Sequence, residues 1–544
     1  MPNLQVHHRM KKFGKQMFPP NFHKPLVWLI IFSCLFSSGN VFAQNVRPGV
    51  ADYVDGELEI LHEDGHQGSR YSYFLKSGGR RLLLNFANDA PTHLTSGARV
   101  RVRGVRTNGT LALAGGGNGV QTLSAAPALN SFGEQRTLVM LVNFADNPAQ
   151  PWSRDTVNQA IFGKVSAFIS ENSYGATWLA GDVTGWLTIS LSSSLCDTTS
   201  LASQAQQAAQ AAGWMPTNYQ RLIYAFPQNA CGFGGASFIG GSPSQAWLNG
   251  DISLRIAGHE FGHGLGLWHS HSMDCGDVSL GSTCTTQEYG DTLDVMGTAS
   301  TAHFNSFQKE RLGWITPLTV TQSGTYILDA YEFNASAIKT LKSIDSTTGA
   351  RTWYYLEARK QIGFDNTLTY QGMTNGVAIR LGSESSGNMS YMLDMTPNSF
   401  ANDGLDPTLP PGYRFSDPAA GVTIVTDWVT ANQAAVTVGV SLPPSTAPTV
   451  TVVTDQPSYT GTQTVSITTT MTSGGSPVPG ASVTFTITKS SGAKVMANAT
   501  TGSNGAAVYK LRLKKQDPLG TYQVGAVAKK DSLTGSGSTQ FTVR

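Results

Sequence analysis

One stretch of eleven residues, 259–269, constrains this chain more than any other part of its sequence; it reads HEFGHGLGLWH. His259 and His263 are four residues apart, so on a helix both imidazoles lie on one face. Gly266 stands where that helix is expected to end, because glycine readily adopts the left-handed conformation that turns the chain. The turn would carry His269 back towards the other two rings. The stretch therefore predicts a helix, a sharp turn and three converging imidazoles.

Three neutral imidazoles are a suitable ligand set for a catalytic zinc ion, since they leave the fourth tetrahedral position open for water. Glu260 follows the first histidine and can reach such a water without binding the metal. The full pattern fixes five positions at once, so a chance surface helix is a weak explanation. We predict that His259, His263 and His269 bind Zn²⁺ and that Glu260 is the general base.

Two other residues compete for the third ligand position. His271 lies two residues beyond His269, but the spacing from Gly266 to His269 fits the longer motif, so we expect His271 in a loop or behind the ligands. Some enzymes with the shorter HExxH motif take a later glutamate as ligand, and Glu288 is the candidate here. That choice would leave Gly266 and His269 without a role, so His269 is preferred.

The eleven residues resemble the zinc signature of the metzincin endopeptidases and, within them, the gametolysin-like peptidases. Three further segments support the resemblance: SYG at 173–175, GGASFIGGSPSQAWLNG at 234–250 and HFNSFQKERLGW at 303–314. It covers residues 134–440. The resemblance implies a sheet-and-helix lobe above an irregular lobe, with the substrate cleft between them. An extended substrate would then add a strand to the edge of the sheet.

The resemblance also implies a Met-turn beneath the metal, after the third histidine. Met296 is the candidate, and its adaptable apolar side chain could support the histidine rings. A methionine buried in the core is the plainer alternative. One departure from the family is Thr298, which stands where some metzincin branches have a tyrosine, so no tyrosine is expected to act from that position.

Length and charge exclude some classes of protein. A chain of 544 residues is too long for a single core and predicts several domains. The net charge of +2 gives no case for nucleic-acid binding. Basic residues precede an apolar run at 26–36, and small or aliphatic residues lead up to Ala43, a pattern typical of an export signal. We expect a signal peptide at 1–43 and a secreted protein; the alternative is an uncleaved anchor, and no later stretch could span a membrane.

The cysteines agree with export. Five become four once Cys34 leaves with the signal, and an even number in an exported chain predicts disulfides. Cys275 and Cys284 bracket a short loop after the zinc ligands and are the expected pair. Cys196 and Cys231 would form the second bond, with free buried thiols as the alternative.

The predicted architecture is multidomain, α+β and β. Residues 44–125 read as an N-terminal β domain with an OB-like strand pattern, either a removable prosegment or a permanent domain; it has no cysteine, so no thiolate latch can come from it. Residues 134–316 read as a metzincin-like zinc peptidase domain, with a helix capped by Ser153. A β-sandwich is expected at 317–441, a proline-rich linker at 443–448 and an immunoglobulin-like domain at 449–544.

Together these features predict a secreted zinc endopeptidase that hydrolyses peptide bonds in proteins or glycoproteins through a zinc-bound water, with Glu260 as base. The C-terminal domain is expected to bind a surface or matrix. The alternatives are an inactive cell-surface adhesin or binding protein and an amidase of cell-wall peptides. A Ca²⁺ site is a further candidate, although solvated loop acids are the commoner explanation; its acids are Asp274, Asp277, Asp291 and Asp294.

Overall fold

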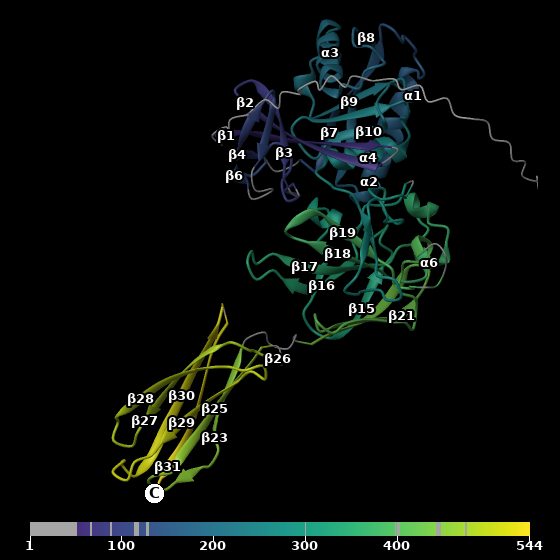
Figure 1. Cartoon of the computed structure of the whole chain (residues 1–544). Helices are drawn as coiled ribbons and strands as arrows, with labels where there is room; N and C mark the ends of the chain where they lie inside the picture. The colour runs from purple at the N-terminus through teal and green to yellow at the C-terminus, as the bar shows by residue number, and fades with distance from the viewer. Residues whose placement is uncertain are drawn as a thin grey trace, which may run out of the picture. The chain divides into compact units, whose positions relative to one another are not determined.

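The computed structural model describes residues 52–65, 68–87, 90–113, 119–126, 130–299, 301–397, 399, 403–441, 448–473, 476–531 and 533–544 (Figure 1). The expected signal peptide at 1–43 lies outside the described residues, as does nearly all of the proline-rich linker. Within the described ranges, no helix is both long and apolar enough to cross a membrane.

The N-terminal strands form a closed barrel. They are β1 (Asp52–Gly65), β2 (Gly68–Ser77), β3 (Arg80–Phe86), β4 (Arg99–Thr107), β5 (Thr110–Leu113) and β6 (Val120–Ser124). Pairing runs β1–β2–β3–β5–β4 and returns from β4 to β1, with only β3 and β5 parallel, which is the closed ring expected of an OB-like barrel. Residues 61–65 at the C-terminal end of β1 continue past β4 and pair there with β10 (Phe233–Phe238) of the next region.

The sheet of the next region is mostly parallel. Its strands are β7 (Gly133–Phe144), β8 (Thr177–Ile189), β9 (Arg221–Phe226), β10 (Phe233–Phe238) and β11 (Ser244–Asn249). β8, β7, β9 and β11 are parallel. β10 runs antiparallel beside β11 and pairs on its other side with β1, so it is the outer strand of this region only when the barrel is left aside. Neither β10 nor β11 was predicted from the sequence, because Gly234 and Gly235 interrupt the alternation of β10 and because β11 is buried on both faces.

Helices cover both faces of this sheet. The helix expected after Ser153 is present as α1 (Arg154–Asn158), a π-helical stretch (Gln159–Val165) and α2 (Ser166–Asn172), and the Ser153 hydroxyl accepts the Thr156 amide at 3.0 Å. These segments pack with α4 (Leu254–Gly264) on one face, and α3 (Thr198–Ala211) covers the other. Neighbouring residues of β7, Leu138 and Val139, belong to the two opposite cores, as alternation along a strand requires.

The following region is a sandwich of two sheets. One is built from β13 (Thr285–Gln287), β12 (His271–Asp274), β19 (Ser386–Leu393), β18 (Ala378–Ser383), β17 (Arg351–Glu357), β16 (Ala337–Ile344) and β14 (Leu318–Val320). The other is built from β15 (Gly324–Asp329), β22 (Gln433–Val440), β21 (Val422–Val429) and β20 (Arg414–Asp417). Since β12 and β13 follow the predicted ligands directly, the loop of the metal site is tied into this sandwich. Short helices α5 (Ser306–Arg311) and α6 (Gln371–Thr374) complete it.

The C-terminal region has two sheets and a core of its own. One contains β23 (Thr449–Thr454), β25 (Thr464–Ser473), β26 (Ser476–Pro477) and β29 (Ala506–Arg512); the other contains β24 (Ser458–Tyr459), β31 (Leu533–Val543), β30 (Gly520–Lys530), β27 (Ser482–Thr488) and β28 (Lys494–Thr500). Val483, Phe485 and Ile487 alternate into the core between the sheets. This arrangement agrees with the predicted immunoglobulin-like domain.

Candidate metal centre

Helix α4 and the turn after it bring three histidines together. The helix ends at Gly264, and Gly266 has a φ of +93°. The Gly266 amide donates to the carbonyl of His263 at 2.7 Å, which closes the turn. The ring centres of His259, His263 and His269 then lie 4.8, 5.2 and 5.0 Å apart. All three side chains are buried.

Each of the three rings is held by an acceptor on its Nδ1 atom. That acceptor is the Val295 carbonyl for His259 (2.7 Å), the Leu267 carbonyl for His263 (2.9 Å) and the Glu288 carboxylate for His269 (2.8 Å). A carbonyl oxygen can only accept, so Nδ1 of His263 carries the proton, and in the neutral ring Nε2 keeps its lone pair, which is the arrangement of metal-binding histidines. Nδ1 of His259 lies near both the Val295 carbonyl and, at 2.9 Å, Nη1 of Arg255.

The Nε2 atoms fit a cation. Those of His259 and His263 are buried and have no hydrogen-bond partner among the described residues. They lie 3.4 and 3.8 Å from Oδ2 of Asp64, and Nε2 of His269 lies 3.1 Å from Oδ1 of the same carboxylate. Ligand atoms on a tetrahedral zinc ion are about 3.3 Å apart, given zinc–ligand distances of about 2.0–2.2 Å. The three distances to Asp64 are close to this spacing. The ligand atoms of His62, Asp64, His263 and His269 also lie within 4.8 Å of one another, so His62 belongs to the same cluster of possible metal ligands.

The sequence analysis missed Asp64 and His62, which β1 brings to the site from about 200 positions away. Residues i and i+2 of a strand share a face, so both side chains point towards the histidines. The ring of His62 lies 4.7 Å from that of His263, and the Tyr289 hydroxyl donates to the Asp64 carboxylate. The only signal in the sequence is the His-x-Asp spacing, which means little without the strand pairing.

Glu260 lies beside the metal position and under β10. Its carboxylate is buried, and neither oxygen has a hydrogen-bond partner among the described residues. Gly235 of β10 leaves the space that this side chain needs, because a Cβ atom there would collide with the carboxylate. A buried carboxylate without partners is costly, so the position points to a chemical role.

Burial and mutual charge shape the electrostatics of this cluster. Burial lowers the pKa of His259, and it holds the pKa of His263 well below its usual range. Burial and then the Asp64 charge raise the pKa of Glu260 well above its usual range. For Asp64 itself burial acts in the opposite direction, but the neighbouring imidazoles hold its pKa well below the usual range. Hydrogen bonds to Asp64 and Glu288 raise the pKa of His269 against the effect of burial.

Met296 lies in the turn that supports the site. Its side chain is fully buried in the core that contains α4, and its sulfur takes up the space that a Cβ on Gly262 would need. The Met296 amide donates to Asp294 at 2.8 Å, and its carbonyl accepts the Ser270 amide at 3.0 Å. The turn is thereby fixed against the segment that carries His269.

The two rival ligands have other partners. His271 lies in β12, and its Nε2 is 3.0 Å from Oδ1 of Asn388. Glu288 accepts from Nδ1 of His269 and lies 3.4 Å from the Tyr71 hydroxyl. In this geometry Glu288 orients a ligand, the role of an outer-sphere carboxylate.

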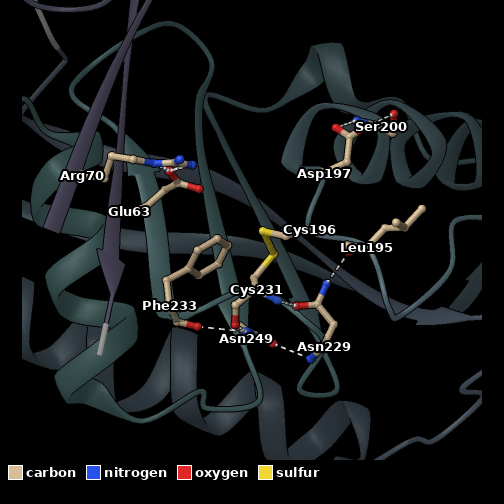
Figure 2. The surroundings of a disulfide bond; sticks show 10 residues. All are labelled: Glu63, Arg70, Leu195, Cys196, Asp197, Ser200, Asn229, Cys231, Phe233 and Asn249. Carbon is tan, nitrogen blue, oxygen red and sulfur yellow. Dashed lines mark hydrogen bonds and ion pairs between the residues drawn. A yellow bond between two sulfur atoms is a disulfide. The ribbon is translucent and has the colours of Figure 1, made fainter. Parts of the chain in front are cut away.

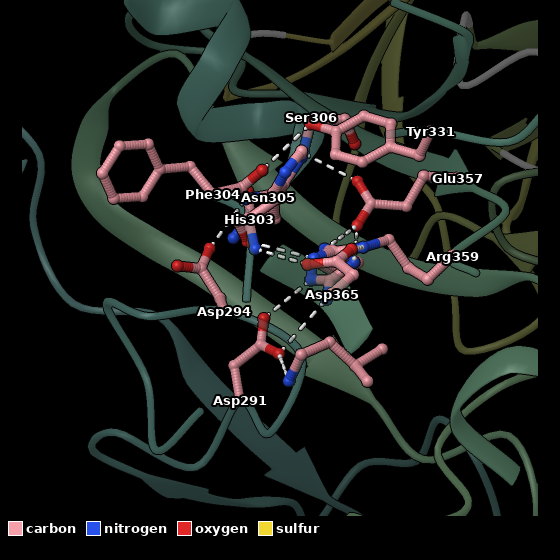
Figure 3. Close-up of polar contacts among 12 residues, drawn as sticks. Asp291, Asp294, His303, Phe304, Asn305, Ser306, Tyr331, Glu357, Arg359 and Asp365 are labelled. Atoms are coloured by element: carbon pink, nitrogen blue, oxygen red, sulfur yellow. Dashed lines mark hydrogen bonds and ion pairs between the residues drawn. The ribbon is translucent and has the colours of Figure 1, made fainter. Parts of the chain in front are cut away.

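The four acidic residues considered for calcium do not share a site. Arg380 donates to Asp291 at 2.7 Å, while Asp294 accepts from the backbone amide of Asn305 at 2.7 Å (Figure 3). Asp274 accepts the Gly276 amide, and Asp277 is exposed. Their separate partners explain these acids as structural or solvated groups, so the geometry gives no support for Ca²⁺.

Both expected disulfides are present, Cys196–Cys231 and Cys275–Cys284. The first lies at the start of β10, where Asn249 also donates to the carbonyls of Cys231 (3.1 Å) and Phe233 (2.9 Å) (Figure 2). The Cys196–Cys231 disulfide and the Asn249 side chain together anchor the start of β10, the strand that passes over Glu260.

Residues 156–369 match the family model of the gametolysin peptidase M11. This match supports a gametolysin-like peptidase, as the sequence predicted, and indicates a metallopeptidase. Residues 449–543 match the model of the MG2 domain. No curated protein matches the chain.

Solved structures resemble the chain only weakly. The alkylpurine DNA glycosylase AlkC of Pseudomonas fluorescens is 16% identical over 18% of this chain and 30% of its own, with a TM-score of 0.14. A CARDB domain from Pyrococcus furiosus is 14% identical over 18% of this chain and 87% of its own (TM-score 0.14). A tandem repeat of a large adhesion protein is 16% identical over 57% of this chain and 62% of its own, with a TM-score of 0.17. The chain covers under a third of the glycosylase. TM-scores of this size do not establish a common fold.

Proposed function

We propose that this chain is a secreted zinc endopeptidase of the metzincin type that hydrolyses peptide bonds in proteins. One observation carries the proposal: the Nε2 atoms of His259, His263 and His269 face one point, and two of them have no other partner among the described residues. Three imidazoles with an open fourth position suit a catalytic zinc ion.

The chain's own residues supply the proton transfers. A divalent metal ion held by the three histidines would contribute Lewis acidity, which lowers the pKa of water and polarises a carbonyl oxygen. Glu260 accepts the proton of the attacking water and then delivers it to the leaving amine. Glu288 and the Val295 and Leu267 carbonyls keep the imidazoles oriented throughout.

The antiparallel edge strand β10 is suited to bind an extended substrate. Its backbone passes directly over Glu260, as the close approach of Gly235 shows. A peptide that pairs with this edge would lie across the metal position and would be held mainly by backbone hydrogen bonds. Such binding requires little sequence specificity and agrees with a general endopeptidase.

Glu260→Gln tests the mechanism. The variant should keep about one zinc ion per chain and lose hydrolysis of casein by about a hundredfold or more, because general acid–base catalysis contributes about 10²–10⁴-fold. Metal content and hydrolysis should be measured before and after limited trypsin treatment, with and without a chelator, and His271→Ala is the control. Full hydrolysis by a zinc-loaded Glu260→Gln chain would contradict the mechanism.

The same assay separates the alternatives. A zinc-loaded wild-type chain that hydrolyses nothing even after trypsin treatment would be an inactive binding protein or adhesin. Cleavage of cell-wall peptides but not casein would make it an amidase. The MG2 segment at 449–543 is proposed to bind a surface or matrix near the substrate.

A further inference from the structure

The end of β1 occupies the edge strand proposed for the substrate. Residues 61–64 of β1 pair antiparallel with β10, and Asp64 lies opposite Gly235, the glycine above Glu260. The backbone groups that β10 would offer to a substrate are therefore engaged by the chain itself. A peptide could pair with this edge only after β1 had left it.

Asp64 adds a ligand at the open position. Its side chain is only 14% exposed, and Oδ2 has no hydrogen-bond partner among the described residues although it faces Nε2 of His259 and of His263. These three buried polar atoms have no hydrogen-bond partner among the described residues and lie close together, which favours a cation between them. A carboxylate oxygen is an ordinary zinc ligand, so Asp64 would complete a tetrahedral set.

The neighbouring acid, Glu63, does not approach the histidines, so this contact is specific to the side chain of Asp64. Glu63 points to the opposite face of β1 and accepts from Nε of Arg70 at 2.6 Å (Figure 2). Two adjacent carboxylates thus have different partners, one an arginine at the surface and one the histidine cluster. Glu63 therefore offers a matched control of equal charge.

The barrel is docked firmly enough to hold Asp64 in place. Trp268, the residue before His269, is buried in the core of the barrel and stacks on Tyr71, with ring centres 5.0 Å apart. Ile239, just after β10, lies in the same core, and its amide donates to the Ile60 carbonyl at 2.9 Å. The link from β10 to the barrel and the residue next to the third histidine are therefore both covered by the barrel.

We propose that Asp64 is the fourth ligand of the metal and that residues 61–64 take the place of the substrate, so that the N-terminal barrel keeps the peptidase latent. The inference rests on the proposed zinc peptidase function and adds its regulation. The carboxylate excludes water from the metal, and the strand excludes the substrate. Activity then requires departure of the barrel, for instance after another peptidase has cut the chain between the barrel and β7.

The test compares intact full-length chains loaded with Co²⁺, whose visible absorption reports the ligands. We would titrate a peptide hydroxamate, a bidentate metal-binding probe, into wild type, Asp64→Asn, Asp64→Ala and Glu63→Gln. The two Asp64 variants should bind the probe about tenfold or more tightly than wild type, since a site that is open less than a tenth of the time loses that factor in affinity. Casein hydrolysis by the Asp64 variants should rise only after the chain has been cut between the barrel and β7, because β1 still pairs with β10 in the intact variants. Glu63→Gln should behave as wild type in both measurements.

Three results would overturn the latch. Equal probe affinity in wild type and both Asp64 variants would show that the fourth position is already open. An equal gain in Glu63→Gln would mean that loosening of the barrel, and not loss of a ligand, opens the site. Failure of every chain to bind Co²⁺ at the histidines would remove the proposed metal centre itself, and the latch with it. Asp64→Asn keeps the shape of the side chain, so a folding defect in Asp64→Ala would not decide the question.

Discussion

The metal position is built from two regions that are held in different ways. The histidines lie within one stretch of eleven residues. The acceptors of their Nδ1 atoms come from the same stretch, at Leu267, or from the segment that follows it, at Glu288 and Val295. Asp64 comes from a separate barrel and reaches the same point only because β1 pairs with β10. The first region is fixed by local geometry, and the second by a contact that could be broken.

This difference has a functional consequence. A group held by its own loop stays in place whenever the domain is folded. A group held by strand pairing and by docking of Trp268 can leave as one unit with its barrel. If the proposed assignments hold, mutation and cleavage of the chain should affect the proposed ligands His259, His263 and His269 differently from Asp64.

The largest effect is expected at a permanent ligand. His269→Ala should weaken zinc binding by more than about a hundredfold, because it removes a proposed ligand. Loss of a residue that only hydrogen-bonds to a ligand typically weakens metal binding by about 10–100-fold. His271→Ala should leave the affinity nearly unchanged, because that ring bonds to Asn388. Competition with a chromophoric chelator measures both. The reverse order would exchange the roles of the two histidines.

The next effect concerns the base. In a chain cut between the barrel and β7, Gly235→Ala should lower kcat/KM by about a hundredfold, because the new Cβ would displace the Glu260 carboxylate. Gly234→Ala is the matched control, since its Cβ would meet only Cδ1 of Ile256 at 3.5 Å. Peptide hydrolysis at equal zinc content decides between them. Equal losses in the two variants would point to general damage to β10.

A smaller effect is expected at the outer sphere. Glu288→Ala should weaken zinc binding by about tenfold, because His269 would lose the acceptor that orients it. The chelator competition used for the histidines applies here too. A loss greater than that of His269→Ala would make Glu288 the third ligand and His269 its support.

The smallest effect is expected far from both regions. A chain that ends after Ser441 should hydrolyse a soluble peptide within about twofold of the full-length rate, because every proposed catalytic residue precedes it. Hydrolysis of an insoluble matrix should fall, since a tethering domain raises the effective concentration of substrate. Equal loss on both substrates would show that the C-terminal domain supports the peptidase fold instead.

The outcome for the fold shows what a single sequence can predict. Helix α4 and its turn were predictable because the spacing of His259 and His263 and the conformational freedom of Gly266 act over a few residues. The disulfides followed from cysteine number and proximity along the chain. Strand β10 was missed because Gly234 and Gly235 interrupt its alternation, and β11 was missed because nearly all of its side chains are buried and so do not alternate. The pairing of β12 with β19 was also missed, since the two strands are separated by more than 100 residues.

The site divides in the same way. The three histidines and Glu260 were predicted from their spacing as metal ligands and base, and the three histidine rings lie close together in the structure. Asp64 could not be identified, because its role depends on the register of β1 against β10 and a shift by one residue would turn it to the other face. The absence of cysteine from the barrel had excluded only a thiolate latch, and a carboxylate was not considered.

Crystals of the intact, zinc-loaded full-length chain would test the central claim most directly, through anomalous difference density at the zinc edge. The account predicts one strong peak within about 2.0–2.2 Å of Nε2 of His259, His263 and His269 and of one carboxylate oxygen of Asp64. A peak bound by the three histidines with water in place of Asp64 would contradict the latch. A peak elsewhere, or none at the histidines, would contradict the metal centre.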